Sequence, residues 1–285
     1  MSTRSVNGAM APRPAEGFDP ALRQRVVSGI VLAVAAIAAV LVGGWLLTLL
    51  ALAAIVVMAD EWSRLIPHAG FEARLVALLA AALLPAAAVL AMEAGNVSLA
   101  FAALLPGTAL AAAVAALLPN GSPDRTAGGV IYVGVPIVAF VWLRNHVAAG
   151  ALHVLWLLVV VWATDICAYF VGRTVGGPKL APTISPGKTW SGLLGGMVGA
   201  GLFGGLVALA AGAGFVLAAT LGSMLAVVAQ AGDLFESALK RRAGVKDSGR
   251  LIPGHGGLLD RIDGLVFATP AFAAVVWLMA AGARP

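Results

Sequence analysis

The sequence predicts an all-α integral membrane protein, a polytopic bundle of about nine transmembrane helices with a cytoplasmic N-terminus. Hydrophobic residues make up 61% of its 285 residues and charged residues only 11%, whereas soluble domains are about 25% charged. The hydrophobic residues form runs that approach the roughly 20 residues needed to cross a bilayer. Basic residues gather in alternate loops between these runs. Together these observations exclude an ordinary soluble globular protein.

Nine hydrophobic runs are the candidate spans, and short glycine turns separate several of them, so their bounds can shift by a few residues. The runs lie at 26–42, 44–59, 74–92, 97–118, 128–143, 150–172, 191–211, 214–239 and 263–282. Residues 1–25 are polar and rich in proline, without a signal-peptide pattern, so we expect a disordered cytoplasmic tail. Residues 26–285 are expected to form a single transmembrane domain without an internal repeat. Glycines in the seventh run favour close helix packing.

The distribution of basic residues supports both the number of spans and their orientation. If the N-terminal tail is cytoplasmic, sixteen of the eighteen lysines and arginines fall on the cytoplasmic side, and only Arg144 and Arg284 fall outside. This is the positive-inside asymmetry of membrane proteins. The net charge of +5 is therefore attributed to topology, and no nucleic-acid partner is expected.

A first polar segment joins the end of the eighth run to the start of the ninth. Asp233, Glu236, Ser237 and Lys240 follow one another at helical spacing, so they share one face of a helix. A carboxylate at the edge of a membrane helix is costly and usually faces a cavity, a cation or a metal. The alternative is an ion pair between Lys240 and one of the two carboxylates that only helps the helix leave the membrane.

Glycines and two further aspartates complete this segment. Residues 253–257 read Pro-Gly-His-Gly-Gly, a turn whose backbone N–H groups can approach a phosphate closely. Asp260 and Asp263 then lie one turn apart at the start of the ninth helix. They could cap that helix, or Asp260 could join Asp233 on a hard divalent cation such as Mg²⁺. Two aspartates beside Arg261 and the glycine turn favour a site. With no cysteine or second histidine nearby, zinc is not indicated.

A second polar segment occupies residues 162–191. Asp165, Tyr169 and Arg173 are spaced four residues apart, so they form a row on the sixth predicted helix. Residues 185–189, Ser-Pro-Gly-Lys-Thr, offer hydroxyls, a lysine and backbone donors to a phosphate. Taken alone, this segment can equally be a basic loop. Because both polar segments are predicted on the cytoplasmic side, we expect them to form one anion-binding site.

Most other polar residues are assigned structural roles. The run Asp60-Glu61-Trp62 ends the second span; such a run is commonly an interfacial anchor, and a functional role is left open for it. Cys167 is expected to pack within its helix. The isolated histidines His68, His146 and His153 are also expected to be structural.

The two polar segments resemble the signature of the phosphatidate cytidylyltransferases, also called CDP-diacylglycerol synthases. That signature has the form Ser-x-x-Lys-Arg, four residues, Lys-Asp, and then Pro-Gly-His-Gly-Gly-x-x-Asp-Arg-x-Asp. The chain matches it at Ser237, Lys240, Arg241, Lys246, Asp247, Pro253, Gly254, His255, Gly256, Gly257, Asp260, Arg261 and Asp263. The family's Gln-x-Gly-Asp-Leu-x-Glu-Ser stretch recurs at residues 230–237. Its upstream pattern recurs at Asp165, Ala168, Tyr169, Gly172, Arg173, 180–182 and 185–189.

The resemblance implies a nucleotidyltransferase of phospholipid biosynthesis that converts CTP and phosphatidate to CDP-diacylglycerol and pyrophosphate. It also implies a bacterial-type cytoplasmic (inner) membrane, and Mg²⁺ at Asp233 and Asp260, as one or two metal ions or with a monovalent cation. The implied catalytic residues are Lys240, Lys246, Asp247, His255 and Arg261. The implied substrate-binding residues are Asp165, Tyr169, Arg173, Ser185, Lys188, Thr189, Ser237, Gly256, Gly257 and Asp263. A bundle rich in glycine and alanine is compatible with a homodimer, although no sequence feature demonstrates one.

Three other functions remain open on the sequence. Another CTP-dependent lipid kinase, such as a polyprenol kinase, would share a nucleotide site but lack the full signature. An ion-coupled transporter would use the intramembrane Asp165 and Asp233, but it predicts internal repeats and polar residues on both sides of the membrane. A structural scaffold would leave the charge clusters unexplained.

Overall fold

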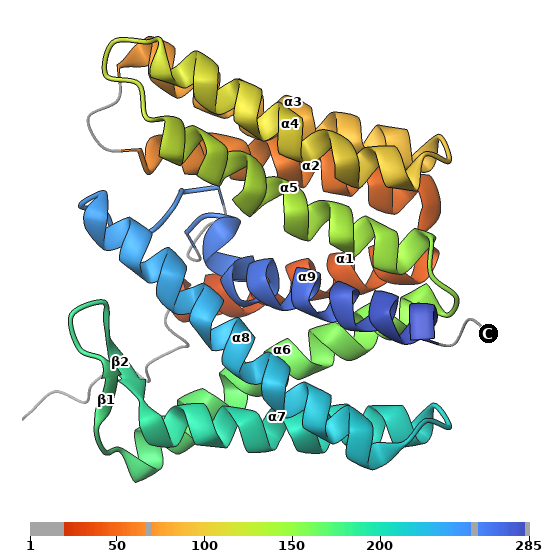
Figure 1. Cartoon of the computed structure of the whole chain (residues 1–285). Helices are drawn as coiled ribbons and strands as arrows, with labels where there is room; N and C mark the ends of the chain where they lie inside the picture. Colours follow the sequence, from red (N-terminus) through yellow and green to blue (C-terminus); the bar gives the residue numbers. More distant parts are fainter. Residues whose placement is uncertain (1–19, 67–69, 252–255, 283–285) are drawn as a thin grey trace, which may run out of the picture.

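The structure is a computed structural model that describes residues 20–66, 70–251 and 256–282. Within these residues nine helices follow one another, with a two-stranded hairpin between the sixth and the seventh (Figure 1). The helices are α1 (Pro20–Val42), α2 (Gly44–Arg64), α3 (Phe71–Glu93), α4 (Val97–Ala116), α5 (Pro123–Asn145), α6 (Gly150–Val175), α7 (Trp190–Ala210), α8 (Phe215–Arg242) and α9 (Leu259–Gly282).

Eight of the described helices, α2 to α9, are long and apolar enough to cross a membrane, while α1 contributes the shorter apolar stretch Gly29–Val42. Large apolar side chains cover the outside of the bundle; Leu105 is 74% exposed and Val198 is 70% exposed. Apolar surface of this extent is expected where a protein meets lipid or a partner. The prediction of a polytopic helical membrane protein is confirmed.

Each predicted run falls largely on one of these helices, but several helices extend into polar sequence. α1 begins at Pro20, inside the predicted tail of residues 1–25, and residues 1–19 of that tail lie outside the described residues. α5 begins at Pro123, ahead of its apolar run, because the fixed φ of proline suits the first position of a helix. α8 continues to Arg242 with three basic residues in its last turn, which interact favourably with the negative end of the helix dipole. Hydropathy therefore marks the apolar part of each helix and not its ends.

Two groups of helices are joined by α9. Helices α2 to α5 pack as one group and α6 to α8 as another, and α9 contacts α5, α6 and α8 (Figure 1). Ile55, Met58 and Val133 belong to the first hydrophobic core, and Leu157 and Ala226 belong to the second. Since α9 contributes side chains to both cores, its position depends on both groups.

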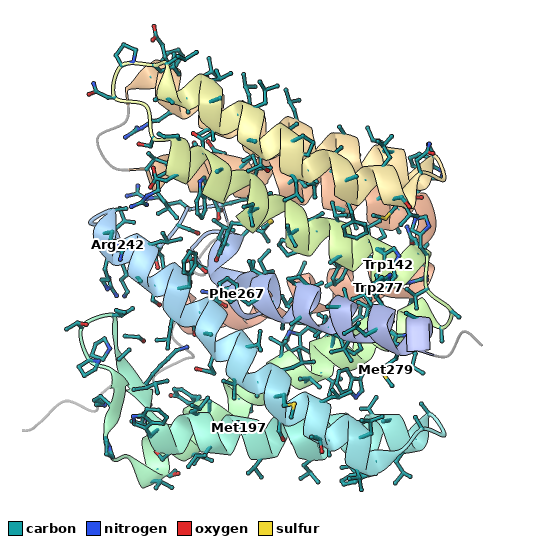
Figure 2. The ribbon with its side chains drawn as sticks, viewed as in Figure 1. Trp142, Met197, Arg242, Phe267, Trp277 and Met279 are labelled. Carbon is teal, nitrogen blue, oxygen red and sulfur yellow. The ribbon has the colours of Figure 1, made fainter. Side chains whose placement is uncertain are left out.

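The charged residues gather at one end of the bundle, which we call the charged end. It carries the loops after α2, α4, α6 and α8, and with them every lysine and arginine side chain that the structure places, except Arg144. Figure 2 labels Arg242 at this end and Trp277 and Met279 toward the opposite end. The predicted gathering of basic residues on one side is confirmed.

Helices α6 and α7 approach backbone to backbone along a row of glycines. A Cβ atom added at Gly192 would lie 2.9 Å from the carbonyl oxygen of Ala168, and one added at Gly196 would lie 3.1 Å from that of Thr164. Cys167 faces the same contact, where a Cβ on Gly199 would overlap its sulfur. The predicted close packing is confirmed, and Cys167 packs within it.

Between α6 and α7 the chain forms an antiparallel hairpin of β1 (Lys179–Ala181) and β2 (Ser185–Thr189). No sequence pattern predicts it, because β2 contains Pro186 and Gly187 and lacks the alternation of a typical strand. β2 leads directly into α7, where Thr189 Oγ1 accepts a hydrogen bond of 3.0 Å from the backbone N–H of Gly192. This N-cap fixes the hairpin to the helix that follows.

Candidate active site

A cavity of about 680 Å³ opens at the charged end, between α6, the hairpin, α7 and α8. Five polar or charged residues predicted for the site line it: Asp165, Tyr169, Arg173, Lys188 and Thr189, together with the predicted metal ligand Asp233. The remaining lining residues are Ala168, Gly172, Gly176, Lys179, Gly187, Gly192, Leu193 and Gln230. Three of the lining positions on α6 and α7 are small residues, so the backbone itself forms part of the wall.

The predicted row on α6 is confirmed. Arg173 donates a hydrogen bond of 2.7 Å from Nη1 to the hydroxyl of Tyr169, and its guanidinium lies 5.9 Å from the centre of the same ring. Asp165 lies two turns deeper on the same helix. The row therefore places a carboxylate inside the cavity and a guanidinium with an aromatic ring nearer its mouth.

Lys188 joins the two polar segments. Its ammonium forms an ion pair with Asp233 of α8 and donates a hydrogen bond of 2.8 Å to Oε1 of Gln230. Asp165 and Asp263 lie close enough to Asp233 for their charges to interact, and Lys188 interacts with both of them. The expectation that the two segments meet is confirmed.

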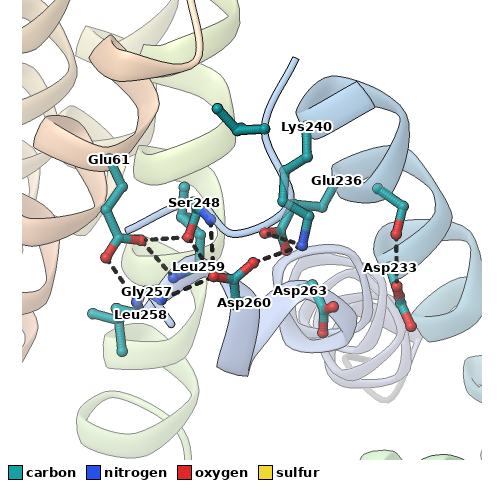
Figure 3. Close-up of polar contacts among 12 residues, drawn as sticks. Glu61, Asp233, Glu236, Lys240, Ser248, Gly257, Leu258, Leu259, Asp260 and Asp263 are labelled. Atoms are coloured by element: carbon teal, nitrogen blue, oxygen red, sulfur yellow. Dashed lines mark hydrogen bonds and ion pairs between the residues drawn. The ribbon is translucent and has the colours of Figure 1, made fainter. Parts of the chain in front are cut away.

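Lys240 lies between two carboxylates (Figure 3). Its Nζ is 2.6 Å from Oδ1 of Asp260 and 3.2 Å from Oε1 of Glu236. The Glu236 side chain is fully buried, and within the described residues its oxygens have no hydrogen-bond partner of good geometry. One ammonium therefore balances two buried carboxylates. The predicted ion pair between Lys240 and Glu236 is present, but it belongs to this larger cluster.

Asp260 also accepts hydrogen bonds at the start of α9. Its Oδ2 accepts from the backbone N–H of Gly257 at 2.8 Å, from that of Ser248 at 2.9 Å and from Ser248 Oγ at 3.0 Å (Figure 3). These donors precede α9, so Asp260 fixes the turn before the helix and does not cap the N–H groups of α9 itself. Gly256 contributes to the same turn with a φ of +84°, and a Cβ there would lie 2.7 Å from Asp260 Oδ2, so only glycine suits this position.

Glu61 reaches this turn from α2. Its side chain is buried, and its carboxylate accepts hydrogen bonds from Ser248 Oγ and from the backbone N–H groups of Leu258 and Leu259. The interpretation as an interfacial anchor is wrong for Glu61, because this side chain points into the protein. Glu61 lies three residues after the buried Met58 and four before the buried Leu65. This helical spacing is the sequence signal that places Glu61 on the inner face of α2.

The remaining predicted residues lie around these clusters with fewer contacts. Ser237 donates a hydrogen bond of 3.3 Å to Asp233, and Asp263 accepts one of 2.7 Å from the backbone N–H of Gly264. Ser185 begins β2 opposite Ala181. Arg261, Lys246 and Asp247 are exposed and make no side-chain hydrogen bond within the described part of the chain. His255 lies outside the described residues. Ser248 was not predicted, although it directly follows the signature residues Lys246 and Asp247.

The donor chemistry of the site is compatible with Mg²⁺. Asp233 faces the cavity and has two neighbouring carboxylates, which are the hard oxygen ligands that Mg²⁺ prefers. Among the residues described, no group of three or more candidate side chains is arranged around one metal position. The assignment to Asp233 and Asp260 stays a prediction.

Comparison with known proteins identifies the family. The model of the cytidylyltransferase family matches residues 23–279. The chain belongs to this family. Among curated proteins, the phosphatidate cytidylyltransferase of Brucella suis biovar 1 is 49% identical over 156 residues, which are 54% of this chain and 56% of that protein. The resemblance predicted from the two polar segments is thus confirmed for the cytidylyltransferase family.

Other curated relatives of this cytidylyltransferase-family chain have the same name. That of Bacillus subtilis is 44% identical over 144 residues, 49% of this chain and 53% of the relative. That of Pseudomonas aeruginosa is 51% identical over 130 residues, 45% of this chain and 48% of the relative. The matched stretch spans about half the length of each of these relatives.

Proposed function

We propose that this protein is a nucleotidyltransferase that transfers the cytidylyl group of CTP to phosphatidate, forming CDP-diacylglycerol and pyrophosphate. The observation that carries the proposal is the meeting of the two signature segments in one cavity at the charged end of a membrane bundle, where Lys188 contacts Asp233 and Gln230. The names of the curated relatives support the same reaction.

The reaction requires charge neutralisation more than a strong base. The second pKa of a phosphate monoester is about 6, so phosphatidate is largely a dianion near pH 7. A phosphate oxygen of this dianion attacks the α-phosphorus of CTP; one P–O bond forms, the bond to the β-phosphate oxygen breaks, and pyrophosphate leaves. The main obstacle is repulsion between the two anions, which cationic side chains at fixed positions reduce.

The cavity supplies such side chains. Arg173, Lys179 and Lys188 line it, and they are assigned to the phosphates of CTP and phosphatidate. Gly187 has open space where a side chain would be, so a phosphate can approach the backbone closely there. Lys188 is held by Asp233 and Gln230, and its ammonium could exchange Asp233 for a phosphate oxygen.

A second cluster, formed by Lys240, Glu236 and Asp260, holds its cation in place. Lys240 is fixed between Asp260 and Glu236, so its charge would need no rearrangement during the reaction. Asp233 and Asp260 would hold Mg²⁺ together with substrate phosphates. The ion when bound would neutralise phosphate charge and align the attacking and leaving oxygens.

We assign the site to the cytoplasmic face of a bacterial inner membrane. The basic loops and the cavity lie at the same end of the bundle, and basic loops stay on the cytoplasmic side. A soluble nucleotide would enter from this side, while phosphatidate would arrive from the adjoining leaflet.

The test is turnover of labelled CTP by the purified protein in phosphatidate-containing micelles with Mg²⁺. Label at the α-phosphate should appear in the lipid product, and label at the γ-phosphate should appear in pyrophosphate. Transfer of the γ-label to a lipid would instead identify a lipid kinase. Asp233→Asn should abolish turnover. Asp60→Asn is the control, because Asp60 is an exposed carboxylate at the same end that pairs with Arg64. Absence of any labelled lipid with the wild-type protein would overturn the proposal.

A further inference from the structure

We propose that Glu61 is a positioning residue of this site: its carboxylate caps α9 and, through Ser248, holds Asp260 in contact with Lys240. The inference rests on the proposed function for its consequence in catalysis. The contacts themselves are independent of that function. They connect a side chain on α2 with a turn that follows it by almost 200 residues.

Both oxygens of Glu61 face backbone donors. Oε1 accepts from the N–H of Leu258 at 2.8 Å, and Oε2 accepts from that of Leu259 at 2.9 Å and from Ser248 Oγ at 2.9 Å (Figure 3). Leu259 is the first residue of α9, so Glu61 satisfies N–H groups at a helix start that have no partner within the helix. The negative charge also suits the positive end of the helix dipole.

The site is shaped for a carboxylate. Glu61 is only 3% exposed, and a Cβ atom added at Gly249 or Gly257 would lie 2.6 Å from its oxygens. Glycine at these two positions therefore makes room for the side chain of Glu61. A glutamine would place its NH₂ group against one of the two backbone N–H donors, so the amide cannot replace the carboxylate without losing a hydrogen bond.

Ser248 transmits the position of Glu61 to Asp260. Its Oγ lies 2.9 Å from Oε2 of Glu61 and 3.0 Å from Oδ2 of Asp260. A hydroxyl has a single proton to donate, so the two carboxylates share the Ser248 proton. The hydrogen bond from Ser248 to Asp260 therefore depends on the position of Glu61. Oδ1 of the same Asp260 then contacts Lys240 at 2.6 Å. A continuous row of contacts thus leads from α2 to the cation of the second cluster.

The end of α2 is itself firmly held. Trp62 donates a hydrogen bond of 2.9 Å from Nε1 to the carbonyl oxygen of Arg125, and its ring lies 5.0 Å from that of Tyr132 on α5. A side chain on a helix fixed in this way can position a loop more accurately than a residue of the loop itself.

Glu61→Gln tests the proposal, with Glu93→Gln as its matched control. Glu93 is another largely buried glutamate, but it lies at the end of the bundle opposite to the charged end. Its Oε1 accepts hydrogen bonds from Thr48 Oγ1 at 2.9 Å and from Asn145 Nδ2 at 2.8 Å. A glutamine can keep both bonds there. We expect Glu61→Gln to lower kcat about 10–100-fold, as loss of a supporting contact around a site commonly does, with little change in the KM for CTP. Glu93→Gln should retain wild-type kcat.

Hydrogen–deuterium exchange provides a second measurement that does not depend on turnover. In the substrate-free protein, exchange at Leu258 and Leu259 should become at least about tenfold faster in Glu61→Gln, since loss of a hydrogen bond worth about 1.4 kcal/mol changes an opening equilibrium tenfold. Ser248→Ala should lower kcat while leaving exchange at these two residues near the wild-type rate. In the double variant the two losses of kcat should not multiply, because both changes interrupt the same row of contacts.

Wild-type kcat and wild-type exchange in Glu61→Gln would overturn the proposal. So would a loss of activity fully explained by a smaller folded fraction, with unchanged kcat per folded molecule. If Glu61→Gln does not fold, Ser248→Ala decides, because wild-type kcat in that variant would show that no position is transmitted to Asp260. A wild-type protein without cytidylyl transfer would contradict the proposed function only, and the exchange measurement would still test the cap.

Discussion

The two clusters of the site differ in how their polar groups are satisfied. The cavity cluster, around Asp233 and Lys188, faces open volume and has few internal hydrogen bonds. The signature cluster, around Asp260 and Lys240, is buried, and nearly every polar atom of Asp260 is bonded to the protein. The first cluster has donors and charges left for a ligand, while the second holds a charge in one position. Binding and positioning are thus divided between the two clusters and not between the two polar segments, because Asp233 and Lys240 belong to the same segment.

Lys240→Met should have the largest effect, because it removes the only cation in contact with both Glu236 and Asp260 in the described structure. Breaking a buried ion pair costs about 3–5 kcal/mol, and loss of a fixed charge at a reacting phosphate costs about 10²–10³-fold in kcat. Thermal unfolding in detergent and CTP turnover measure the two effects. Arg242→Met, an exposed change in the same turn, should resemble wild type. A Lys240→Met protein that unfolds at the wild-type temperature would refute the buried role of this lysine.

Lys188→Met should have a smaller effect of a different kind. Its side chain is 18% exposed and is assigned to substrate phosphate, so its loss should raise the KM for CTP about tenfold or more, as expected for a hydrogen bond to a charged group. The unfolding temperature should change little. Arg64→Met is the control, because Arg64 forms an exposed pair with Asp60 at 2.7 Å, and such pairs contribute little. A lower unfolding temperature with unchanged KM would show that Lys188 stabilises the fold and does not bind substrate, so the cavity cluster would not differ from the signature cluster in its role.

Gly192→Ala should have the smallest effect on turnover. A Cβ there would lie 2.9 Å from the carbonyl oxygen of Ala168, so α7 must move away from α6 and widen the cavity. Overpacking of this kind costs about 1–3 kcal/mol, and we expect a several-fold lower kcat/KM for CTP. Gly214→Ala is the matched control, since its φ is −71° and its Cβ would meet nothing within 4 Å. Equal activities of the two variants would show that the width of the α6–α7 contact does not limit the site.

The features that depend on local spacing could be predicted from the sequence. Hydropathy located all the helices, and a spacing of four placed Asp165, Tyr169 and Arg173 on one face. The same argument placed Asp233, Glu236, Ser237 and Lys240 together. In the structure this row divides, with Asp233 bonded toward the hairpin and Lys240 bonded toward α9. Spacing alone cannot show such a division, because it depends on which helices pack on each side.

The meeting of the two polar segments could be predicted, but the individual contacts between distant residues could not. The bonds from Glu61 span 187 to 198 residues, and no periodicity relates positions so far apart. The hairpin was missed for another reason. Its short strands contain proline and glycine, and they are held by the start of α7 and by the contact of Lys188 with α8. Tertiary contacts rather than intrinsic strand preference stabilise them.

The long separation between Glu61 and its partners has a consequence for how the protein is made. At about 5–20 residues per second, the ribosome needs roughly 10–40 seconds to proceed from α2 to the turn that supplies the donors for this carboxylate. During this interval α2 rests at the membrane with a glutamate that lacks its final partners. Because Glu61 lies near the end of α2, its carboxylate can stay hydrated at the membrane surface during this interval. This avoids the free-energy cost of burying a charge without a partner. A helix that is synthesised much later, α9, therefore completes a contact begun by α2.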